Sequence, residues 1–366
     1  MIRILVVDDS ALVRKLFKRV LSEEPDFEVS FARNGLEALA QLEVFKPDVI
    51  TLDVQMPEMD GLECLDRIML QRPCPVVMVS SVTADGAETT LDALKLGAVD
   101  FVAKPAGAVS LGMDEFAPII KEKIRAAAGA KVRASRRLKD RLRFKAGGLP
   151  AARMRDKTPE LTPDADEVRQ GEGMVLVGTS TGGPPALEAL LTQIPASFPW
   201  PILVAQHMPA GFTGPLARRL DGLCALTVVE ASQPMMTQAG HVYIGRGDAD
   251  IVVSKRGGVL LVMPVPARPG YPWHPSTDRL VRSAREHVPA TQLIGVLMTG
   301  MGNDGAEAMT ELRAQGGHTI AEAEETAVVW GMPGELVRAG GASWVVPLSK
   351  IAHRLQGLVP AHAIRT

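Results

Sequence analysis

The sequence predicts an α/β protein with two doubly wound parallel-sheet domains joined by a linker. Short apolar runs alternate with amphipathic stretches over the first 125 residues, the same alternation resumes at Met174, and the composition changes sharply in between. Because parallel strands need helical crossovers, such alternation is typical of a parallel sheet covered by helices. The chain has 366 residues, and a single core usually stops growing by roughly 250 residues, so two domains are expected.

The first domain is expected to span residues 1–122. Its strands are predicted where short apolar runs lie between stretches with the helical period. These runs are Ile4–Val7, Phe27–Phe31, Val49–Leu52, Val76–Val79 and Val99–Val102. Since a helical pattern separates each run from the next, the strands are expected to form one parallel sheet.

A linker is predicted over residues 123–173. Between Lys131 and Arg155 the chain has ten Lys or Arg residues against one acidic residue, and a polar, proline-containing stretch follows. A basic run can contact nucleic acid, but no nucleic-acid-binding motif lies beside this one. A solvated linker that begins as an extension of the preceding helix is therefore favoured, and no nucleic-acid partner is expected.

The second domain is expected to span residues 174–360. Its predicted strands are Met174–Val177, Ile202–Ala205, Leu226–Val229, Val242–Ile244, Ile251–Val253, Val259–Val262 and Leu293–Met298. The two halves of the chain share the alternation but not their motifs, so no internal repeat is indicated. The second half is therefore predicted to be a separate α/β domain.

Composition and charge exclude several classes of protein. The net charge of −2 favours no strongly charged partner. Cys64, Cys74 and Cys224 are an odd number without the spacing of metal ligands, so neither a disulfide framework nor a zinc site is expected. The run Ile4–Val7 is too short for a signal peptide, and no run nears the roughly 18 residues of a membrane span. A cytoplasmic protein without membrane insertion is expected.

Polar side chains follow four strands of the first domain where the strands end. Asp8 and Asp9 follow the first strand, Asp53 ends the third, Ser80 ends the fourth and Lys104 follows the fifth. The carboxyl ends of parallel strands meet at one edge of a sheet, so these groups should converge. Three carboxylates suit Mg²⁺, and together with the lysine they could hold a phosphoryl group. Capping of a helix by the two N-terminal aspartates would explain only part of the pattern.

The second domain opens with the glycine-rich corner "GTSTGG" at residues 178–183. It lacks the glycine spacing of a dinucleotide-binding loop and the lysine of a P-loop. Two interpretations remain. Either Ser180 or Thr181 is the N-cap of the following helix, or Ser180 is a nucleophile and the glycines leave room for its substrate. A nucleophilic serine needs an imidazole base and a third group that orients the imidazole.

His207 and Asp304 are the candidates for those two roles. His207 directly follows a predicted strand in "PILVAQHMPAGF", a placement that the other six histidines lack. Asp304 follows another strand in the glycine-rich turn of "LIGVLMTGMGNDGAEAM", where it could otherwise cap the next helix. The glycines of that turn let backbone amides approach a ligand closely, as an oxyanion site requires. The chain order Ser, His, Asp differs from that of the α/β-hydrolases.

Residues 1–122 closely resemble the receiver domain of two-component response regulators, which has a flavodoxin-like fold. The resemblance implies that Asp53 accepts a phosphoryl group from a histidine kinase. The Mg²⁺ ligands that it implies are Asp9, Asp53 and the backbone carbonyl of Gln55, with Asp8 supporting through water. Ser80 and Lys104 would then report phosphorylation by moving toward the new charge.

Residues 172–360 resemble the Rossmann-like catalytic domain of the chemotaxis protein-glutamate methylesterases of CheB type. The motifs that carry the resemblance are "GTSTGGPPALEALL", "QHMPAGFTGPLARRL", "GVLMTGMGNDGAEAM" and "EETAVVWGMPGELV". A receiver in front of this domain also matches the family. The resemblance implies a catalytic triad of Ser180, His207 and Asp304, an oxyanion amide at Met301 and a supporting hydrogen bond from Thr181 near the histidine.

The substrates implied by the resemblance are glutamate γ-methyl esters on the cytoplasmic helices of chemoreceptors, and in many members also glutamines of the same helices. No cofactor is expected for the ester chemistry, and Mg²⁺ is expected only for receiver phosphorylation. The resemblance also implies that the unphosphorylated receiver covers the mouth of the active site. Arg246 and His274 stand where the family usually has proline and arginine, which leaves the identity of the receptor open.

Two alternatives from other classes remain at this point. A response regulator with a DNA-binding output domain would need a helix-turn-helix and a basic face, whereas residues 174–360 have the pattern of an α/β sheet protein. A response regulator with a non-catalytic protein-interaction domain on the same fold is the second alternative. Replacement of Ser180 by Ala distinguishes the two: an esterase would lose methanol release while it stays folded, whereas a non-catalytic domain has no such activity to lose.

Overall fold

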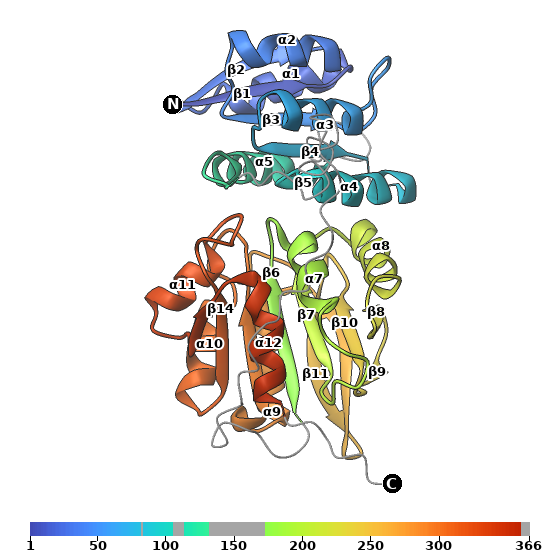
Figure 1. Cartoon of the computed structure of the whole chain (residues 1–366), viewed down its shortest axis with the longest axis vertical. Coiled ribbons are helices and arrows are strands. Elements are labelled where there is room, and N and C mark those ends of the chain that lie inside the picture. Colours follow the sequence, from blue (N-terminus) through green and yellow to red (C-terminus); the bar gives the residue numbers. More distant parts are fainter. Residues whose placement is uncertain (82, 105–112, 132–172, 360–366) are drawn as a thin grey trace, which may run out of the picture. The chain divides into compact units, whose positions relative to one another are not determined.

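The computed structural model describes residues 1–81, 83–104, 113–131 and 173–359 (Figure 1). The chain divides into two compact units, Met1–Leu161 and Thr162–Thr366, and each contains a parallel sheet. The predicted fold class is therefore confirmed. Most of the expected linker, residues 132–172, lies outside the described residues. Its first part overlaps helix α5 (Met113–Ala128), so this helix continues past the domain boundary expected at residue 122.

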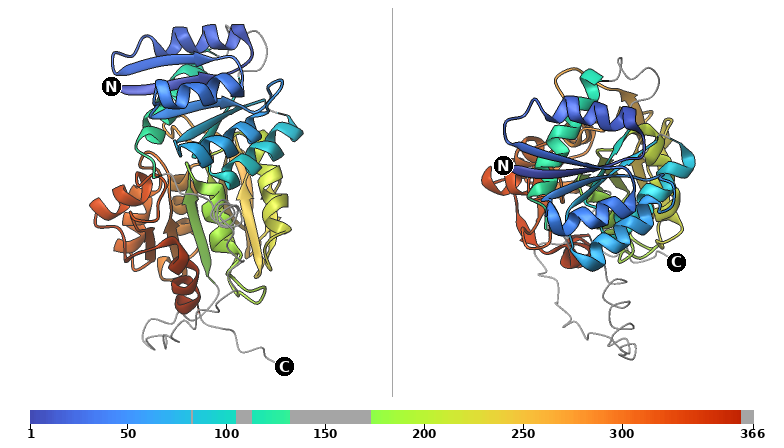
Figure 2. Two further views of the ribbon diagram at one scale, coloured as in Figure 1. Left: turned by 45° about the horizontal axis from the view of Figure 1, so that its top comes forward. Right: turned by 90° about the horizontal axis from the view of Figure 1, so that it is seen from above.

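The first unit is a five-stranded sheet in the order β2-β1-β3-β4-β5, with every pair of neighbours parallel. Its strands are β1 (Ile2–Val7), β2 (Phe27–Ala32), β3 (Val49–Asp53), β4 (Val76–Ser80) and β5 (Asp100–Ala103). Its other helices are α1 (Ala11–Leu21), α2 (Gly35–Val44), α3 (Gly61–Gln71) and α4 (Ala84–Leu96). Helices α1 and α5 share one face of the sheet, where the Phe17 and Phe116 rings meet edge to face, and α2, α3 and α4 pack in a row on the other (Figure 2).

The local sequence explains how this sheet presents its polar edge. Strands β3 and β4 are buried along their whole length, and Asp53 and Ser80 are their last residues. After β1, the side chain of Ser10 caps α1 by accepting a hydrogen bond from the backbone N–H of Val13. The N-cap of α1 is therefore Ser10, and the capping role considered for Asp8 and Asp9 was wrong.

The second unit contains a seven-stranded parallel sheet in the order β15-β14-β13-β6-β7-β10-β8. Its strands are β6 (Met174–Thr179), β7 (Ile202–Gln206), β8 (Thr227–Ala231), β10 (His241–Gly245), β13 (Leu293–Leu297), β14 (His318–Glu322) and β15 (Trp344–Val346). The chain builds outward from β6 in one direction and later returns to β13 on its other side. In sheets of this kind, ligands bind at the carboxyl ends of the strands beside such a reversal.

Two predicted strands lie in a different sheet. Strands β11 (Ala249–Arg256) and β12 (Val259–Pro266) pair antiparallel with each other, and β12 pairs antiparallel with β9 (Met235–Met236). The prediction that these apolar runs belong to the parallel sheet was wrong. Only Gly257 and Gly258, both with positive φ angles, connect the two strands, and a two-residue turn is too short for the crossover that parallel strands need. Strands β9, β14 and β15 were not predicted.

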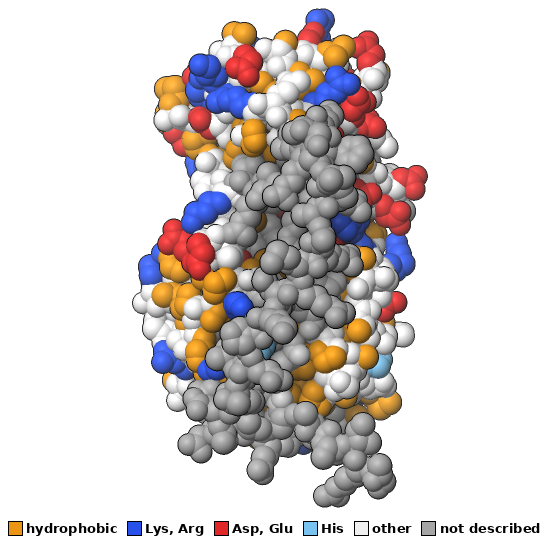
Figure 3. Space-filling model, viewed as in Figure 1, with side chains coloured by type: hydrophobic (Ala, Val, Ile, Leu, Met, Phe, Trp, Pro, Cys, Tyr) orange, Lys and Arg blue, Asp and Glu red, His pale blue; other side chains and the backbone are white. Residues whose placement is uncertain are grey.

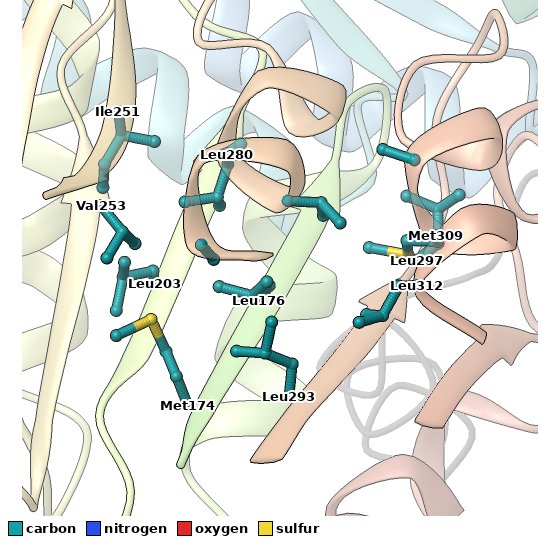
Figure 4. Packing of buried hydrophobic residues seen from close by; sticks show 14 of the residues in the cluster. Met174, Leu176, Leu203, Ile251, Val253, Leu280, Leu293, Leu297, Met309 and Leu312 are labelled. Carbon is teal, nitrogen blue, oxygen red and sulfur yellow. The ribbon is translucent and has the colours of Figure 1, made fainter. Parts of the chain in front are cut away.

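The helices of the second unit cover both faces of its parallel sheet. They are α7 (Gly183–Leu191), α8 (Ala210–Asp221), α9 (Thr277–His287), α10 (Ala306–Ala314), α11 (Met332–Arg338) and α12 (Leu348–Leu358), with a short 3₁₀ helix at Ala290–Gln292. Figure 4 shows the core under α9, where Leu280 lies near Leu176 of β6 and Leu203 of β7. Ile251 and Val253 of β11 complete this core from the antiparallel sheet. Helix α9 is thereby fixed against both sheets, and its N-terminus lies at the functional edge.

Two surface properties concern partners. Within the described ranges, every helix is too short or too polar to cross a membrane. Where Figure 3 shows described residues, Lys and Arg side chains lie among Asp and Glu side chains.

Candidate active site

Ser180 lies in the sharp turn between β6 and α7. Its backbone N–H donates to the carbonyl of Thr299 at 3.0 Å, and its carbonyl accepts from the N–H of Gly183 at 2.8 Å. Only 5% of the residue is exposed. The N-cap of α7 is Gly182, which adopts the left-handed conformation and provides no side-chain cap. The interpretation of Ser180 or Thr181 as the helix N-cap was therefore wrong.

The glycines around Ser180 allow close packing within the protein. A Cβ on Gly182, whose φ is +76°, would lie 2.8 Å from Val328, so this residue faces the interior. A Cβ on Gly300 would lie 2.8 Å from the Cβ of Ser180. The expectation that Gly182 leaves room for substrate is therefore not supported. The absence of a side chain at Gly300 instead lets the turn that carries Met301 lie against the serine.

His207 follows β7 and is held against the serine turn. Its backbone N–H donates to the carbonyl of Thr179 at 3.1 Å. Its Nε2 lies 2.8 Å from Oδ2 of Asp304, and the imidazole is 7% exposed. Nδ1 is buried and has no hydrogen-bond partner among the described residues. The ring therefore has one nitrogen engaged with a carboxylate and one available for a proton.

The carboxylate of Asp304 has four hydrogen-bond partners. Oδ2 accepts from the N–H of Thr277 at 2.6 Å in addition to its contact with His207. Oδ1 accepts from Oγ of Ser276 at 3.0 Å and from the N–H of Asp278 at 3.1 Å. Burial raises the pKa of Asp304, but His207 and the backbone donors outweigh it and hold the pKa below its usual value. Asp304 is thus an ionised acceptor bound to the first turn of α9.

The structure brings the three predicted loops together but forms no hydrogen bond between Ser180 and His207 within its described residues. Such contacts are often loose before substrate binds. Met301 is 8% exposed in the turn after β13, beside the serine. Thr181 contributes its carbonyl, which accepts from Oγ1 of Thr299 at 2.8 Å. The candidate nucleophile, base, orienting carboxylate and oxyanion amide therefore lie in the loops after the neighbouring strands β6, β7 and β13.

Two buried residues that sequence reasoning missed connect these loops. The side-chain amide of Gln206 donates to the carbonyl of Ser180 at 3.1 Å and to the carbonyl of His207 at 3.0 Å. Oγ1 of Thr299 accepts from the N–H groups of Val328 and Val329, both at 3.1 Å. Gln206 ends the buried strand β7 and Thr299 lies two residues after the buried strand β13, and this placement is the signal that could have identified them. They fix the turn that carries Ser180 relative to His207 and to the turn that carries Met301.

The first unit has a second cluster, at the carboxyl edge of its own sheet. Ligand atoms of Asp8, Asp9 and Asp53 all lie within 4.8 Å of one another. Nζ of Lys104 lies 2.7 Å from Oδ2 of Asp53 and 3.1 Å from Oδ2 of Asp8. Burial raises the pKa of Asp53, although the hydrogen bond from Lys104 opposes this shift. For Lys104 the ion pairs outweigh burial, and its pKa is raised.

The other two predicted residues of this cluster lie at its border. The backbone N–H of Gln55 donates to Oδ1 of Asp53 at 3.3 Å, which brings this segment close to the carboxylates. The hydroxyl of Ser80 donates instead to the carbonyl of Gly86 at 3.2 Å, so it points toward α4 rather than toward Asp53. An all-oxygen set with an adjacent lysine fits a hard cation such as Mg²⁺ and a phosphoryl group.

Comparison with known proteins matches both units. Residues 4–112 match the family described as response regulator receiver domain, and residues 175–355 match the family described as CheB methylesterase. A protein-glutamate methylesterase/protein-glutamine glutaminase from Rhodopseudomonas palustris is 57% identical over 363 residues, which cover 96% of each chain. Its counterpart from Rhodospirillum rubrum is 53% identical, covering 97% of this chain and 95% of the relative.

A solved structure resembles the second unit. The crystal structure of the CheB methylesterase catalytic domain of Thermotoga maritima superimposes with a TM-score of 0.50 at 37% sequence identity. The match covers 52% of this chain and 100% of that domain. Each family match therefore falls on one of the two units, and the two relatives match nearly the whole chain.

Proposed function

Because the chain belongs to the CheB family of chemotaxis protein-glutamate methylesterases, we propose that Ser180 is the nucleophile with which it hydrolyses glutamate γ-methyl esters on chemoreceptors. The observation that supports this role is the state of His207. Its Nε2 is bound to the ionised Asp304, and its buried Nδ1 has no partner among the described residues. An imidazole held in this way donates from Nε2 and keeps the lone pair of Nδ1 for a proton.

The proposed reaction proceeds in two steps. Nδ1 of His207 takes the hydroxyl proton of Ser180 as Oγ attacks the ester carbonyl, and the oxyanion is held by the backbone N–H of Met301. The imidazolium then gives its proton to the departing methoxide, which leaves as methanol. Water, deprotonated by the same nitrogen, attacks the acyl-serine and releases the glutamate. Glutamine side chains follow the same path and release ammonia.

Asp304 contributes to both steps without touching the substrate. Its carboxylate fixes the ring orientation of His207 and stabilises the imidazolium. The N–H groups at the start of α9 keep it ionised, since they lower its pKa together with His207. Thr181, through its carbonyl, supports the oxyanion turn at Thr299.

Labelling with a fluorophosphonate ester tests the nucleophile directly. We expect one phosphonyl group on Ser180, located by peptide mass spectrometry, and slow labelling when His207 is replaced by Gln. Labelling of another serine in wild-type protein would overturn the assignment. A His207→Gln variant that labels as fast as wild type would do the same.

The first unit, with a boundary that we place after the end of α5 at Ala128, is proposed to regulate the reaction. Asp53 accepts the phosphoryl group from a histidine kinase, and Mg²⁺ neutralises charge on that group when it is bound. The residues that would hold Mg²⁺ are Asp9, Asp53 and the carbonyl of Gln55, with Asp8 acting through water. Lys104 already contacts Asp53, while Ser80 must turn away from Gly86 to reach a phosphoryl group there.

The receiver is proposed to restrain the esterase until it is phosphorylated. A fragment that lacks the receiver should therefore be faster than the unphosphorylated full-length protein. Equal rates would contradict the restraining role. The cytoplasmic helices of the receptor are the proposed substrate, which places the reaction in the cytoplasm.

A further inference from the structure

Asp250 is a fully buried carboxylate that belongs neither to the triad nor to the receiver. It lies in β11, and its relative exposure is 0%. Oδ1 accepts from the backbone N–H of Ser276 at 2.7 Å and lies 2.9 Å from Nδ1 of His274. Oδ2 accepts from Nη1 of Arg279 at 2.6 Å. Asp250 therefore ties the antiparallel sheet to the segment Trp273–Arg279.

That segment contacts the catalytic site at two points. Ser276, Thr277 and Asp278 supply three of the hydrogen bonds that Asp304 accepts. Trp273 lies parallel to the ring of His207, with 6.0 Å between ring centroids and 6° between planes. Trp273 also lies over the oxyanion turn, because a Cβ on Gly302 would lie 2.7 Å from its ring.

Ser276 is the direct link between the two buried carboxylates. Its backbone N–H donates to Asp250, and its hydroxyl donates to Asp304. A shift of Ser276 away from Asp250 would therefore move the hydroxyl and the adjacent N–H groups that define the orientation of Asp304. Because charge-assisted hydrogen bonds are short and directional, Asp250 restricts this shift more than a neutral acceptor would.

We propose that Asp250 is a positioning residue for the esterase reaction, which holds the segment Trp273–Arg279 so that Asp304 and His207 keep their reactive orientation. The inference rests on the proposed triad. Asn at position 250 keeps the size of the side chain but replaces one acceptor oxygen with a donor, so it cannot accept from Ser276, His274 and Arg279 together. One of these contacts must open.

His274 offers a second and milder way to test the same link. The residue is half-buried, and its Nδ1 faces Asp250. The amide nitrogen of Asn can stand near the position of Nδ1 and donate to Asp250, whereas Leu cannot. If the link to Asp250 matters, His274→Asn should resemble wild type more closely than His274→Leu.

The experiment measures methanol release from methylated receptor membranes by the full-length protein in the presence of a phosphodonor. We expect Asp250→Asn to lower kcat about 10- to 100-fold, the size of loss that a small misplacement of reacting groups produces, with KM within about twofold of wild type. We expect His274→Leu to lower kcat and His274→Asn to restore most of the loss.

Thr319→Val is the matched control for stability. Thr319 is a fully buried hydroxyl in β14 that donates to the carbonyl of Gly341 and lies outside the proposed network. This variant should lower the unfolding midpoint while kcat stays near that of wild type.

Three results would overturn the inference: an unchanged kcat in Asp250→Asn, a loss confined to KM, or equal losses in His274→Asn and His274→Leu. If Asp250→Asn does not fold, the two His274 variants decide. Failure of the triad itself is distinguishable, because Ser180→Ala would then still release methanol.

Discussion

Asp278 and Asp304 accept hydrogen bonds from the first turns of each other's helices. Asp304 precedes α10 and accepts from the N–H groups of Thr277 and Asp278 in the first turn of α9. Asp278 lies in α9 and accepts from the N–H of Ala308 in the first turn of α10. This exchange fixes the carboxylate of Asp304, the proposed orienting group, relative to two helices, since each helix N-terminus favours a negative group.

Replacement of Asp304 by Asn should abolish most of the activity. The amide would offer one acceptor oxygen where the carboxylate accepts four hydrogen bonds, and it would favour the wrong tautomer of His207. We expect kcat to fall by about 10⁴-fold, the scale seen when the orienting carboxylate of a serine triad is neutralised. Methanol release measures the effect, and a fall of less than tenfold would exclude Asp304 as the orienting group.

Asp278 should make stability depend on pH in the opposite direction from Asp304. Burial, followed by the charge of Asp304, raises the pKa of Asp278 to about 6. A raised carboxyl pKa stabilises the folded state below the unfolded pKa, and this contribution is lost as pH rises through about 6. The lowered pKa of Asp304 gives stability above the unfolded pKa that is lost as pH falls.

The variant Asp278→Asn isolates the first effect, because Asn can still accept from Ala308. The difference in unfolding midpoint, variant minus wild type, should be larger at pH 7 than at pH 4.5. Chemical denaturation at the two pH values measures this difference. The same offset at both values would contradict a raised pKa for Asp278.

Gly182→Ala should damage both packing and turnover, and Gly258→Ala is its control. Both glycines have positive φ, +76° and +86°, so alanine costs roughly 1–2 kcal/mol of backbone strain at either position. Only at Gly182 does the added Cβ meet protein atoms, at 2.8 Å from Val328, whereas nothing lies within 4 Å at Gly258. We expect both variants to lose stability and only Gly182→Ala to lose kcat. Equal kcat values in the two variants would show that this packing does not position Ser180.

Asp53→Asn should prevent stimulation by a small phosphodonor. The amide is a poor phosphoryl acceptor, and it leaves Lys104 with only Asp8 as an ionised partner. The measurement is the ratio of methanol release rates with and without phosphodonor and Mg²⁺. A ratio above one in wild type and near one in the variant is expected, and an equal ratio in both would exclude Asp53 as the regulatory site.

The fold and the placement of the residues proposed as the triad could be predicted largely because their signals are local in the sequence. Ser180, His207 and Asp304 each follow an apolar run that becomes a buried parallel strand, so strand ends alone bring them to one edge. The antiparallel sheet could not be predicted in the same way, because an apolar run such as Val259–Val262 suits either kind of sheet. A double-glycine turn was the signal that was overlooked.

The residues around the triad depend on contacts that are distant in the chain. Asp250 meets Ser276 across 26 positions, and Asp278 meets Ala308 across 30. Neither aspartate lies at the end of a parallel strand, and an aspartate near the start of a helix ordinarily indicates a local cap. Their partners lie on other elements, and only the packing of α9 against β11 and α10 brings them together.

Methanol release from methylated chemoreceptor membranes by wild type and Ser180→Ala tests the central claim most directly. The account predicts release by wild type that rises with phosphodonor, and none above background from Ser180→Ala, with unchanged circular dichroism and unfolding midpoint. Wild-type turnover in a folded Ser180→Ala variant would contradict the claim that Ser180 is the nucleophile.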